Sequence, residues 1–557
     1  MKFLEKLKQN YDYIFIFLIW ILIFGKNTFS QLMFVDFIPD TYFTTLKMLT
    51  SSNYHYILNP LDILRFIFST LHLLPILFQL SMLISMLFSY FYIKRLFKDK
   101  EKVFAILFAF IFFFNPFVYS RIMIGQLGVL LAYILIPIPL FYLFQLFDSN
   151  LNFKSLAKLA IAVTLTSLFS IHFFIIHFIM FLVASIWFYK KISIKKLLPI
   201  FLGFLILLML LNSFWIQGIF SNKIFQSIDS SHEDFFSPKI STNIPAVAKI
   251  IGMSGFWRES SYQSTYNILG SVFYYVLICI LLILFLSAYY LSQDKKSRFF
   301  YTLFWIGLIL GTGISHPYTR PFFDSLFKYL PFFNGFRDSH KLVSLIALSY
   351  AYFIPVFALE IKSKIKLKIL PIILIILFTL LFTFPLIGLW NQIKPVNYPS
   401  SYNELNSFLD SKEITGKIIY LPWQTYLTYN WTLGSSSDGR IAVPINQVIK
   451  YPVITGPDLY GSKTELNHGI TNCLSENSIS CLEQNSVQFV IQDKCSVYKD
   501  DQITKNLSSK AYSNACIDLY ELNSTPLAKQ TIPLRFIITS IISILTLIFL
   551  IVVIKKK

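Results

Sequence analysis

The chain is dominated by apolar runs of about 20 residues that follow one another along most of its length. A run of this length is what an α-helix needs to cross the hydrocarbon core of a bilayer. Hydrophobic residues make up 55% of the 557 residues and charged residues only 14%, whereas a soluble protein carries about 25% charged residues. The sequence therefore excludes a cytosolic globular enzyme and predicts a polytopic α-helical membrane protein.

The net charge of +19 lies almost entirely in short segments at the ends of the apolar runs. Lys and Arg concentrate in this way in the cytoplasmic loops of membrane proteins. The long polar stretch 391–531, by contrast, has 11 basic and 13 acidic residues. The basic excess is therefore a topology signal, and we expect no nucleic-acid partner. Seven segments hold 24 Lys and Arg and 6 Asp and Glu: 1–10, 94–102, 148–158, 190–196, 294–298, 360–368 and 555–557.

One topology places all seven basic segments in the cytoplasm. It requires the run 159–189 to form two short helices that turn near Ser170–His172, because a single crossing there would put every later basic loop outside. The sequence thus predicts about twelve transmembrane helices, both termini in the cytoplasm, and a plasma-membrane location with the first run retained as a signal anchor. The other crossings are expected near 12–34, 73–93, 103–118, 127–147, 197–218, 269–290, 299–314, 341–359, 369–389 and 532–554.

This topology leaves four segments outside the cytoplasm. Three of them, 35–72, 219–268 and 315–340, are loops of a transmembrane domain expected over 1–390. The fourth, 391–531, is long enough for a domain with its own core, and 532–557 would follow it as a C-terminal anchor with a basic tail. An expected helix over 402–409 and expected strands over 417–423, 487–492 and 517–521 predict that 391–531 is an extracytoplasmic α/β domain.

Four of the five cysteines fall in this outer domain, namely Cys473, Cys481, Cys495 and Cys516. Outside the cytoplasm they favour one or two disulfides, with three pairings open. A zinc site would need paired C-x-x-C spacing, which the sequence lacks. Cys279 lies alone in an apolar run and is expected to be a packing residue.

The loop after the first apolar run carries two carboxylates, Asp36 and Asp40, among Phe, Val and Ile. A carboxylate that is partly desolvated at the membrane surface is a good candidate for a general base. On the alternative interpretation, Asp40 caps a helix over Thr41–Leu49 and Asp36 is merely interfacial.

With an acid after the first helix, many further helices and an outer domain near the C-terminus, the sequence resembles the C-type (GT-C) glycosyltransferase superfamily. Four stretches are similar to those of arabinofuranosyltransferase-like and YfhO-like membrane proteins: Asn115–Arg121 (NPFVYSR), Gly125–Gly128 (GQLG), Asn212–Trp215 (NSFW) and Phe336–Lys341 (FRDSHK). The resemblance implies transfer of a sugar from a polyprenyl-phosphate donor to a glycan, lipid or protein acceptor at the outer membrane face. The sequence lacks the Asp-X-Asp or Glu-X-Asp pair of a metal-dependent member, since Asp36 and Asp40 are four positions apart.

The resemblance also implies roles for the two carboxylates. Asp36 would be the base that deprotonates the acceptor hydroxyl. Asp40 would assist, either through a divalent cation such as Mg²⁺ or Mn²⁺ or by orienting the acceptor. No other cofactor is implied, and no firm metal site.

Cations at outer helix ends are candidates for binding the donor phosphate. Arg337, His340 and Lys341 precede a helix expected to start near 341, where side-chain charge and the helix N-terminus would both stabilise an anion. The alternative is that these side chains only reach toward lipid headgroups. Arg121 and Gln126, in the short outer turn 118–126, are candidates to line the same cavity; on the alternative interpretation, Arg121 only contacts lipid phosphates.

The loop 219–268 offers a sugar-stacking pair, Trp257 and Arg258, and a second acidic pair, Glu233 and Asp234. His172 and His177 are five positions apart, which does not suit two metal ligands on one helix face, so buried and hydrogen-bonded histidines are expected. His316 and Arg320 are loop residues with a weaker signal.

Two other functions compete with the glycosyltransferase, and the sequence leaves the first of them open. A non-catalytic carrier or assembly factor that binds a polyprenyl lipid or glycolipid would need the cations but no acid at Asp36. An ion-coupled transporter is disfavoured, because it would need charged residues at mid-membrane depth and the runs 197–218, 269–290 and 369–389 contain none. Motifs of soluble hydrolases and nucleotide-binding enzymes are absent from the sequence.

Overall fold

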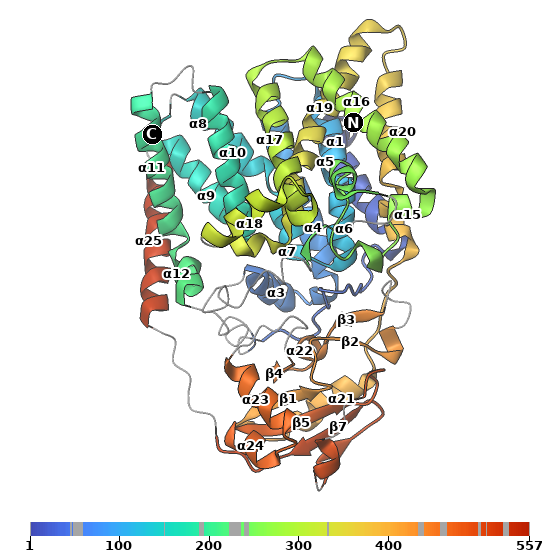
Figure 1. Cartoon of the computed structure of the whole chain (residues 1–557), viewed down its shortest axis with the longest axis vertical. Helices are drawn as coiled ribbons and strands as arrows, with labels where there is room; N and C mark the ends of the chain where they lie inside the picture. The colour runs from blue at the N-terminus through green and yellow to red at the C-terminus, as the bar shows by residue number, and fades with distance from the viewer. Residues whose placement is uncertain are drawn as a thin grey trace.

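The chain forms a large helical bundle and, beyond one end of it, a smaller unit built on a β-sheet (Figure 1). The computed structural model describes residues 2–44, 47, 60–149, 151–188, 194–221, 236–238, 244–330, 333–432, 439–456, 465–499, 503–507, 509–526 and 534–555.

The helical bundle is built from residues before 392 and from the last helix of the chain. Helix α19 lies at its centre, packed against α5, α16, α17 and α20. The last helix, α25, packs against α9, α11 and α12, so the chain returns to the bundle after the sheet unit (Figure 1). The bundle helices are α1 (Lys2–Phe24), α3 (Pro60–Thr70), α4 (Leu77–Leu96), α5 (Lys102–Phe113), α6 (Pro116–Ile124), α7 (Leu127–Ile134), α8 (Pro137–Asp148), α9 (Phe153–Phe169), α10 (His172–Phe188), α11 (Ile194–Leu211), α12 (Ser213–Ser221), α14 (Ala246–Ile251), α15 (Thr265–Leu269), α16 (Ser271–Leu291), α17 (Lys295–Thr312), α18 (Arg320–Tyr329), α19 (Val343–Lys364), α20 (Leu370–Phe382) and α25 (Leu534–Lys555). Short 3-10 helices join several of them: η1 (Gly25–Asn27), η2 (Leu74–Ile76), η5 (Glu259–Ser261), η6 (Gly313–Ser315), η7 (Phe333–Arg337), η8 (Ser339–Leu342) and η9 (Phe384–Asn391).

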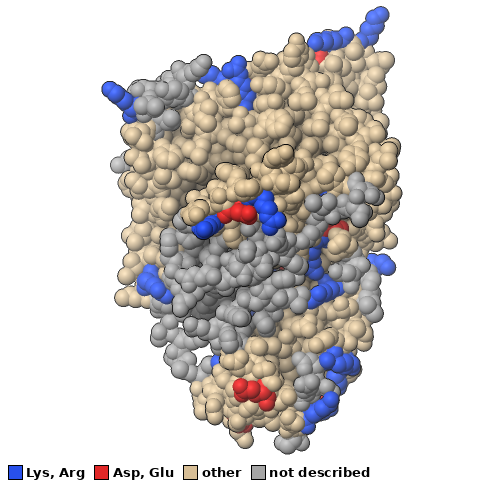
Figure 2. Space-filling model, in the orientation of Figure 1, with Lys and Arg blue, Asp and Glu red and all other residues tan. Residues whose placement is uncertain are grey.

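The bundle has the helices of a multi-pass membrane protein. In the described part of the chain, six helices are long and apolar enough to cross a bilayer, or eight if each of two bent pairs counts as one span. On the face shown in Figure 2, the surface over the bundle is almost free of charged side chains between its upper rim and a small group below its middle. The predicted total of twelve crossings, and the side of the membrane on which each loop lies, stay predictions.

The run 159–189 forms two helices, as predicted. Helices α9 and α10 have 17 residues each and meet at Ser170 and Ile171. Both pack against α8, and α9 also packs against α7 and α11. At 1.5 Å per residue, each helix is about 26 Å long, slightly less than the hydrocarbon thickness.

Three expected spans end or bend earlier than predicted. The first helix ends at Phe24 instead of continuing to 34, because Gly25 adopts a φ of +54°. The expected span 103–118 bends by 42° at Asn115, whose side chain caps α6 at Val118 and donates to the last carbonyls of α5. The expected span 369–389 bends by 48° where η9 begins with Pro385 near its N-terminus, since proline has no N–H for the helical ladder.

The smaller unit carries a five-stranded mixed sheet in the order β4-β1-β5-β7-β6. Strand β1 pairs in parallel with β4 and β5, and β7 runs antiparallel to β5 and β6. Because side chains alternate along a strand, Ile418 and Tyr420 enter one hydrophobic core while Ile419 and Leu421 enter another on the opposite face. The elements are α21 (Ser400–Leu409), β1 (Lys417–Leu421), β2 (Tyr426–Thr428), η10 (Asn430–Thr432), β3 (Arg440–Ala442), α22 (Ile445–Val448), β4 (Val453–Ile454), α23 (Glu465–Ser475), α24 (Ile479–Gln484), β5 (Val487–Asp493), η11 (Thr504–Asn506), β6 (Tyr512–Ser513) and β7 (Ile517–Glu521). The expected helix over 402–409 and the three expected strands are thus present.

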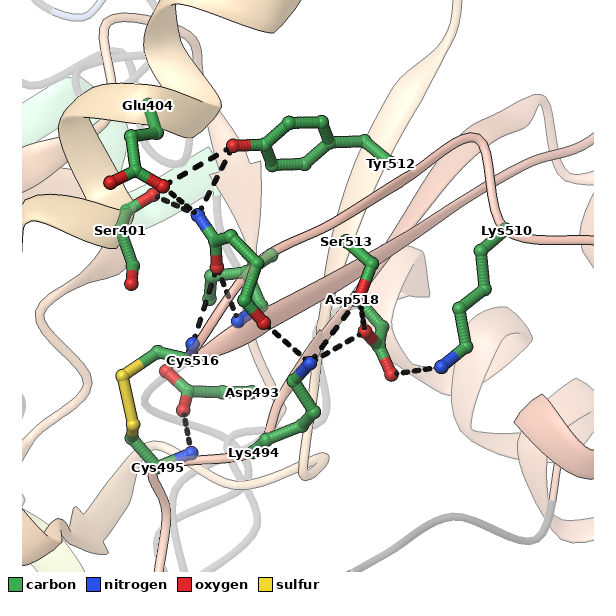
Figure 3. A network of polar contacts seen from close by, with 12 residues as sticks. Ser401, Glu404, Asp493, Lys494, Cys495, Lys510, Tyr512, Ser513, Cys516 and Asp518 are labelled. Carbon is green, nitrogen blue, oxygen red and sulfur yellow. Dashed lines mark hydrogen bonds and ion pairs between the residues drawn. A yellow bond between two sulfur atoms is a disulfide. The ribbon is translucent and has the colours of Figure 1, made fainter.

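Two disulfides tie this unit together, Cys473–Cys481 and Cys495–Cys516. Beside the second, Asp518 of β7 accepts hydrogen bonds from Ser513, from Lys494 at 2.8 Å and from Lys510 at 2.7 Å (Figure 3). Burial alone would raise the pKa of Asp518, but these three donors outweigh it and hold the pKa below its usual value. Cys279 has a free thiol and is exposed on the surface of α16.

The loop that follows α1, residues 28–44, lies between the bundle and the sheet unit. Its backbone pairs with the sheet unit at several points: Leu32 bridges Pro395, the Ala442 N–H donates to the Val35 carbonyl at 2.8 Å, and the Thr41 N–H donates to the Gln447 carbonyl at 3.0 Å. Met33 and Ile38 are buried in the core of the sheet unit, whereas Phe34 and Phe37 are buried in the bundle. Side chains of this loop therefore enter the cores of both parts of the molecule.

Candidate active site

Residues 34–37, at the tip of the loop that follows α1, form a tight turn that packs against the C-terminal end of α6. The Phe34 N–H donates to the Phe37 carbonyl at 2.8 Å, and the Asp36 N–H donates to the Ile124 carbonyl at 2.7 Å. Gly125 ends α6 with a φ of +83°, and a Cβ there would lie 2.6 Å from the Cβ of Phe34. Only glycine permits both this backbone conformation and this close approach, so the sequence of α6 fixes where Asp36 lies.

The Asp36 carboxylate contacts two side chains from distant parts of the sequence. The Tyr426 hydroxyl of β2 donates to Asp36 Oδ1 at 2.9 Å. Arg258 Nη1 lies 3.8 Å from the same oxygen. With its side chain 23% exposed, Asp36 is accessible, as a base acting on a bound substrate must be, and a cation lies close to it.

Asp40 lies in a different environment from Asp36. Its carboxylate is buried and forms an ion pair with Arg65 Nε of α3 at 2.8 Å, and Arg65 also binds Asp62 at 3.0 Å. Burial raises the pKa of Asp40, and the charges of Arg65 and Lys47 partly offset the effect. Lys47 in turn donates to the Asn446 carbonyl of the sheet unit at 2.7 Å. These contacts make Asp40 a residue that fastens the loop to α3. The helix that Asp40 was expected to cap does not begin at Thr41, because residues 41–44 are not helical; residues 45, 46, 48 and 49 lie outside the described part of the chain.

A second cluster is centred on Arg121 of α6, which is completely buried. Arg121 Nη1 binds Asp338 Oδ2 at 2.9 Å and also the Gln126 side chain, while Nη2 lies 2.9 Å from His340 Nδ1. The guanidinium lies over the ring of Phe256, 4.4 Å from its centroid. Burial would raise the pKa of Asp338, but Arg121, Lys341 and His340 outweigh it and hold the pKa well below its usual range.

Lys341 and His172 extend this second cluster toward the hairpin of α9 and α10. Lys341 Nζ lies 3.6 Å from Asp338 Oδ2 and 3.3 Å from His172 Nε2. His172 Nε2 also lies 2.8 Å from the Gly335 carbonyl, so it belongs to a hydrogen-bonded network. His177 is buried and contacts the Phe173 carbonyl of its own helix, as expected for a structural histidine.

The segment Phe256–Arg258 connects the two clusters. Phe256 packs against Arg121 and against the ring of His340, and Arg258, two residues later, reaches Asp36. Because consecutive Cα atoms are about 3.8 Å apart, Asp36 and the Arg121 cluster are near neighbours at one end of the bundle. Glu259 holds this segment in place through an ion pair with Lys249 at 3.2 Å, and burial raises the pKa of Glu259 despite that lysine.

The structure therefore brings most of the candidate residues together, though in two groups. Asp36 and Arg258 are in contact, and Arg121, Gln126, His340 and Lys341 share one network. Trp257 and Arg337 both pack on the ring of Phe236 at the edge of this region. Arg320 pairs with Asp324 on the exposed face of α18, and His316 lies just before that helix. Glu233 and Asp234 lie outside the described residues.

Two partners in this site, Asp338 and Tyr426, were not predicted from the sequence. Asp338 lies inside the similar stretch Phe336–Lys341, and its signal is that a group of buried cations needs a counter-charge. No local pattern marks Tyr426, since it is 390 positions from Asp36. In the described part of the chain, no three His, Cys, Asp or Glu side chains gather as they would around a metal ion, and a divalent cation on Asp36 and Asp40 stays a prediction.

No protein-family model and no curated protein matches the chain. Solved structures of one membrane protein do have a similar fold: a single-particle cryo-EM structure of the arabinofuranosyltransferase AftD from Mycobacteria has a TM-score of 0.58 and 11% identity over 93% of this chain. A structure of a mutant of that protein gives a TM-score of 0.59 at 11% identity, again over 93% of this chain. The chain spans 40% of the length of the first structure and 42% of the second.

At this identity the likeness is one of fold. It extends over nearly the whole chain, the helical bundle and the sheet unit together. The predicted resemblance to arabinofuranosyltransferase-like proteins is therefore confirmed for the fold: nearly the whole chain folds like part of the arabinofuranosyltransferase AftD.

Proposed function

We propose that the protein is a glycosyltransferase of the plasma membrane that moves a sugar from a polyprenyl-phosphate donor to a glycan, lipid or protein acceptor. The proposal places 1–390 in the membrane with its site at the outer face, 391–531 outside the cell as an α/β domain, and 532–557 as the closing anchor. The fold likeness to a membrane arabinofuranosyltransferase supports this class of activity.

The reaction would form one bond and break another at the anomeric carbon of the sugar. The acceptor oxygen bonds to this carbon as the bond to the donor phosphate breaks, and Asp36 takes the proton of the acceptor hydroxyl. The polyprenyl phosphate leaves with the electron pair and carries negative charge, which nearby cations stabilise. Arg258 lies beside Asp36, Lys341 is a candidate in the neighbouring network, and Arg337 is a candidate on the ring of Phe236.

Other candidate residues have supporting roles in the proposal. The contacts of the buried Arg121 with Asp338, Gln126 and His340 suit a residue that holds the walls of the site in place. Trp257 is proposed to stack on a sugar ring. Asp40, in its ion pair with Arg65, is proposed to fix the loop that carries Asp36.

The observation that carries the proposal is the position of Asp36. A partly exposed carboxylate lies next to Arg258 where the bundle meets the sheet unit, in a fold similar to that of a membrane glycosyltransferase. A base and a phosphate-binding cation are both required to transfer a sugar from a lipid phosphate, whereas a carrier needs only the cation.

Turnover of a radiolabelled polyprenyl-phosphate sugar by the purified protein in lipid nanodiscs tests the proposal. We expect transfer by the unaltered protein and none by Asp36→Asn, with the same unfolding midpoint in both. Asp99→Asn, the same substitution at an exposed position of the loop after α4, should leave transfer unchanged. Donor binding without turnover by the unaltered protein would favour the non-catalytic carrier, and full turnover by Asp36→Asn would remove Asp36 from the mechanism.

A further inference from the structure

One hairpin of the sheet unit lies against the loop that carries Asp36. Strands β2 and β3 form this hairpin, in which Tyr426 pairs with Ala442. The Ala442 N–H donates to the carbonyl of Val35, the residue before Asp36, at 2.8 Å. The backbone of the hairpin is thus bonded to the loop directly beside the candidate base.

Tyr426 points out of the sheet unit and toward the bundle. Its ring packs against the hydrophobic core of the bundle, whereas the next residue, Leu427, is buried in the core of the sheet unit. This is the alternation of a strand whose two faces meet different partners. This alternation therefore places the Tyr426 side chain at the boundary between the two parts of the molecule.

At the end of this side chain, three groups contact one another. The Tyr426 hydroxyl donates to Asp36 Oδ1 at 2.9 Å, Arg258 Nη1 lies 3.8 Å from that oxygen, and the Arg258 guanidinium lies 5.5 Å from the centroid of the Tyr426 ring. The carboxylate is thus held between a hydroxyl from the sheet unit and a cation from the bundle. A hydrogen bond to one carboxylate oxygen fixes the rotation of the group.

Docking of the sheet unit does not depend on the Tyr426 hydroxyl. Three other bonds join the same loop to the sheet unit: Thr41 N–H to the Gln447 carbonyl, Val396 N–H to the Gln31 carbonyl, and Tyr398 hydroxyl to the Pro39 carbonyl at 2.6 Å. The Tyr426 hydroxyl can therefore be removed without separating the two parts, and its specific contribution is the contact with Asp36.

We propose that the sheet unit is part of the active site, and that Tyr426 is a positioning residue that orients the Asp36 carboxylate toward the acceptor hydroxyl. This inference rests on the proposed function and extends it, because it assigns the outer unit a direct role in transfer instead of only covering the site. A base that is free to rotate abstracts a proton less efficiently, since hydrogen-bond geometry governs general-base catalysis.

Tyr426→Phe tests the proposal, with Tyr498→Phe as the matched control, since Tyr498 is an exposed tyrosine of the same unit. Two quantities are measured in full-length protein in nanodiscs: steady-state transfer, and the carboxylate stretching band of Asp36, isolated as the infrared difference between each protein and its Asp36→Asn counterpart. We expect Tyr426→Phe to lower kcat about ten- to hundredfold with KM for the donor unchanged, and to shift the Asp36 band. Tyr498→Phe should change neither.

The two readings separate this inference from the proposed function. A shifted Asp36 band without transfer by the unaltered protein would support the contact and reject the transferase. Transfer by the unaltered protein with kcat and band unchanged in Tyr426→Phe would overturn the role of Tyr426 and leave the transferase standing. A lower unfolding midpoint in Tyr426→Phe, with an unshifted band, would assign the hydroxyl to docking and also overturn the inference.

Discussion

Arg121 illustrates how far individual residues depend on partners distant in the sequence. Its guanidinium is completely buried, and its charge is compensated by Asp338, 217 positions later. The sequence identified Arg121 as a functional candidate because its surroundings resemble a family stretch, but it could not identify the partner, because that requires knowing which helix ends meet. The same holds for Asp36 and Tyr426. The sequence predicted which side chains are candidates for function, but it did not predict which residues they contact.

Asp338→Asn is expected to destabilise the protein by about 3–5 kcal/mol, because it leaves the buried Arg121 charge without its counter-charge. The midpoint of unfolding by SDS in mixed micelles measures this change. Asp324→Asn is the control: its pair with Arg320 is about half exposed on α18, so little change is expected. Equal effects of the two substitutions would show that the buried Arg121–Asp338 pair contributes no more to the free energy of unfolding than an exposed pair does.

At the scale of elements, hydrophobic length predicted that helices exist but not where they end. The hairpin of α9 and α10 followed from charge parity, a constraint that acts over the whole chain. The ends at Gly25, Asn115 and Pro385 depend on a glycine conformation, a side-chain cap and a proline. The breaks matter for the site, because the bend at Asn115 starts α6, which carries Arg121 and contacts the Asp36 turn.

Helix α18 is expected to lie in the lipid headgroup region on the outer face of the plasma membrane. It is joined by few residues to the end of the candidate span Lys295–Ser315. It exposes Phe322 and Tyr329, whose spacing of seven places them on one helix face, and Tyr318 is exposed just before the helix begins. Aromatic residues are enriched at the level of the lipid headgroups. A bimane label at Ser325→Cys, in a Cys279→Ser background, should be quenched by lipids with a headgroup nitroxide. Quenching by aqueous iodide alone would place the helix away from the bilayer.

In the sheet unit, Asp518 is expected to contribute stability that depends on pH. Its pKa is held below its usual value by Lys494, Lys510 and Ser513, which outweigh burial. The contribution is therefore fully present above the pKa of an unfolded aspartate, about 3.9, and is lost as the pH falls through the lower folded value. Asp518→Asn should lower the unfolding midpoint at pH 7, and the difference from the unaltered protein should shrink in acid. A difference that is the same at both pH values would contradict this account.

At the scale of the whole molecule, the distribution of charge along the chain predicts one orientation. In that orientation the loop after α4 would be cytoplasmic and the sheet unit would be outside, because all the basic segments would share one side of the membrane. A membrane-impermeant maleimide should label Lys412→Cys in intact cells and Lys98→Cys only after permeabilisation, both in a Cys279→Ser background. The reverse pattern would invert the topology and place Asp36 on the cytoplasmic side.

The central claim is that Asp36 and the cations beside it meet one lipid-linked donor where the bundle joins the sheet unit. The most direct measurement is photo-crosslinking with a polyprenyl-phosphate sugar that carries a diazirine near the phosphate, followed by mapping of the modified peptides by mass spectrometry. The account predicts crosslinks in the loop after α1 that carries Asp36, in 253–263 and in 333–341. These crosslinks should be lost in the presence of excess unlabelled donor. Competed crosslinks confined to cytoplasmic loops or to the outer surface of α25 would contradict it.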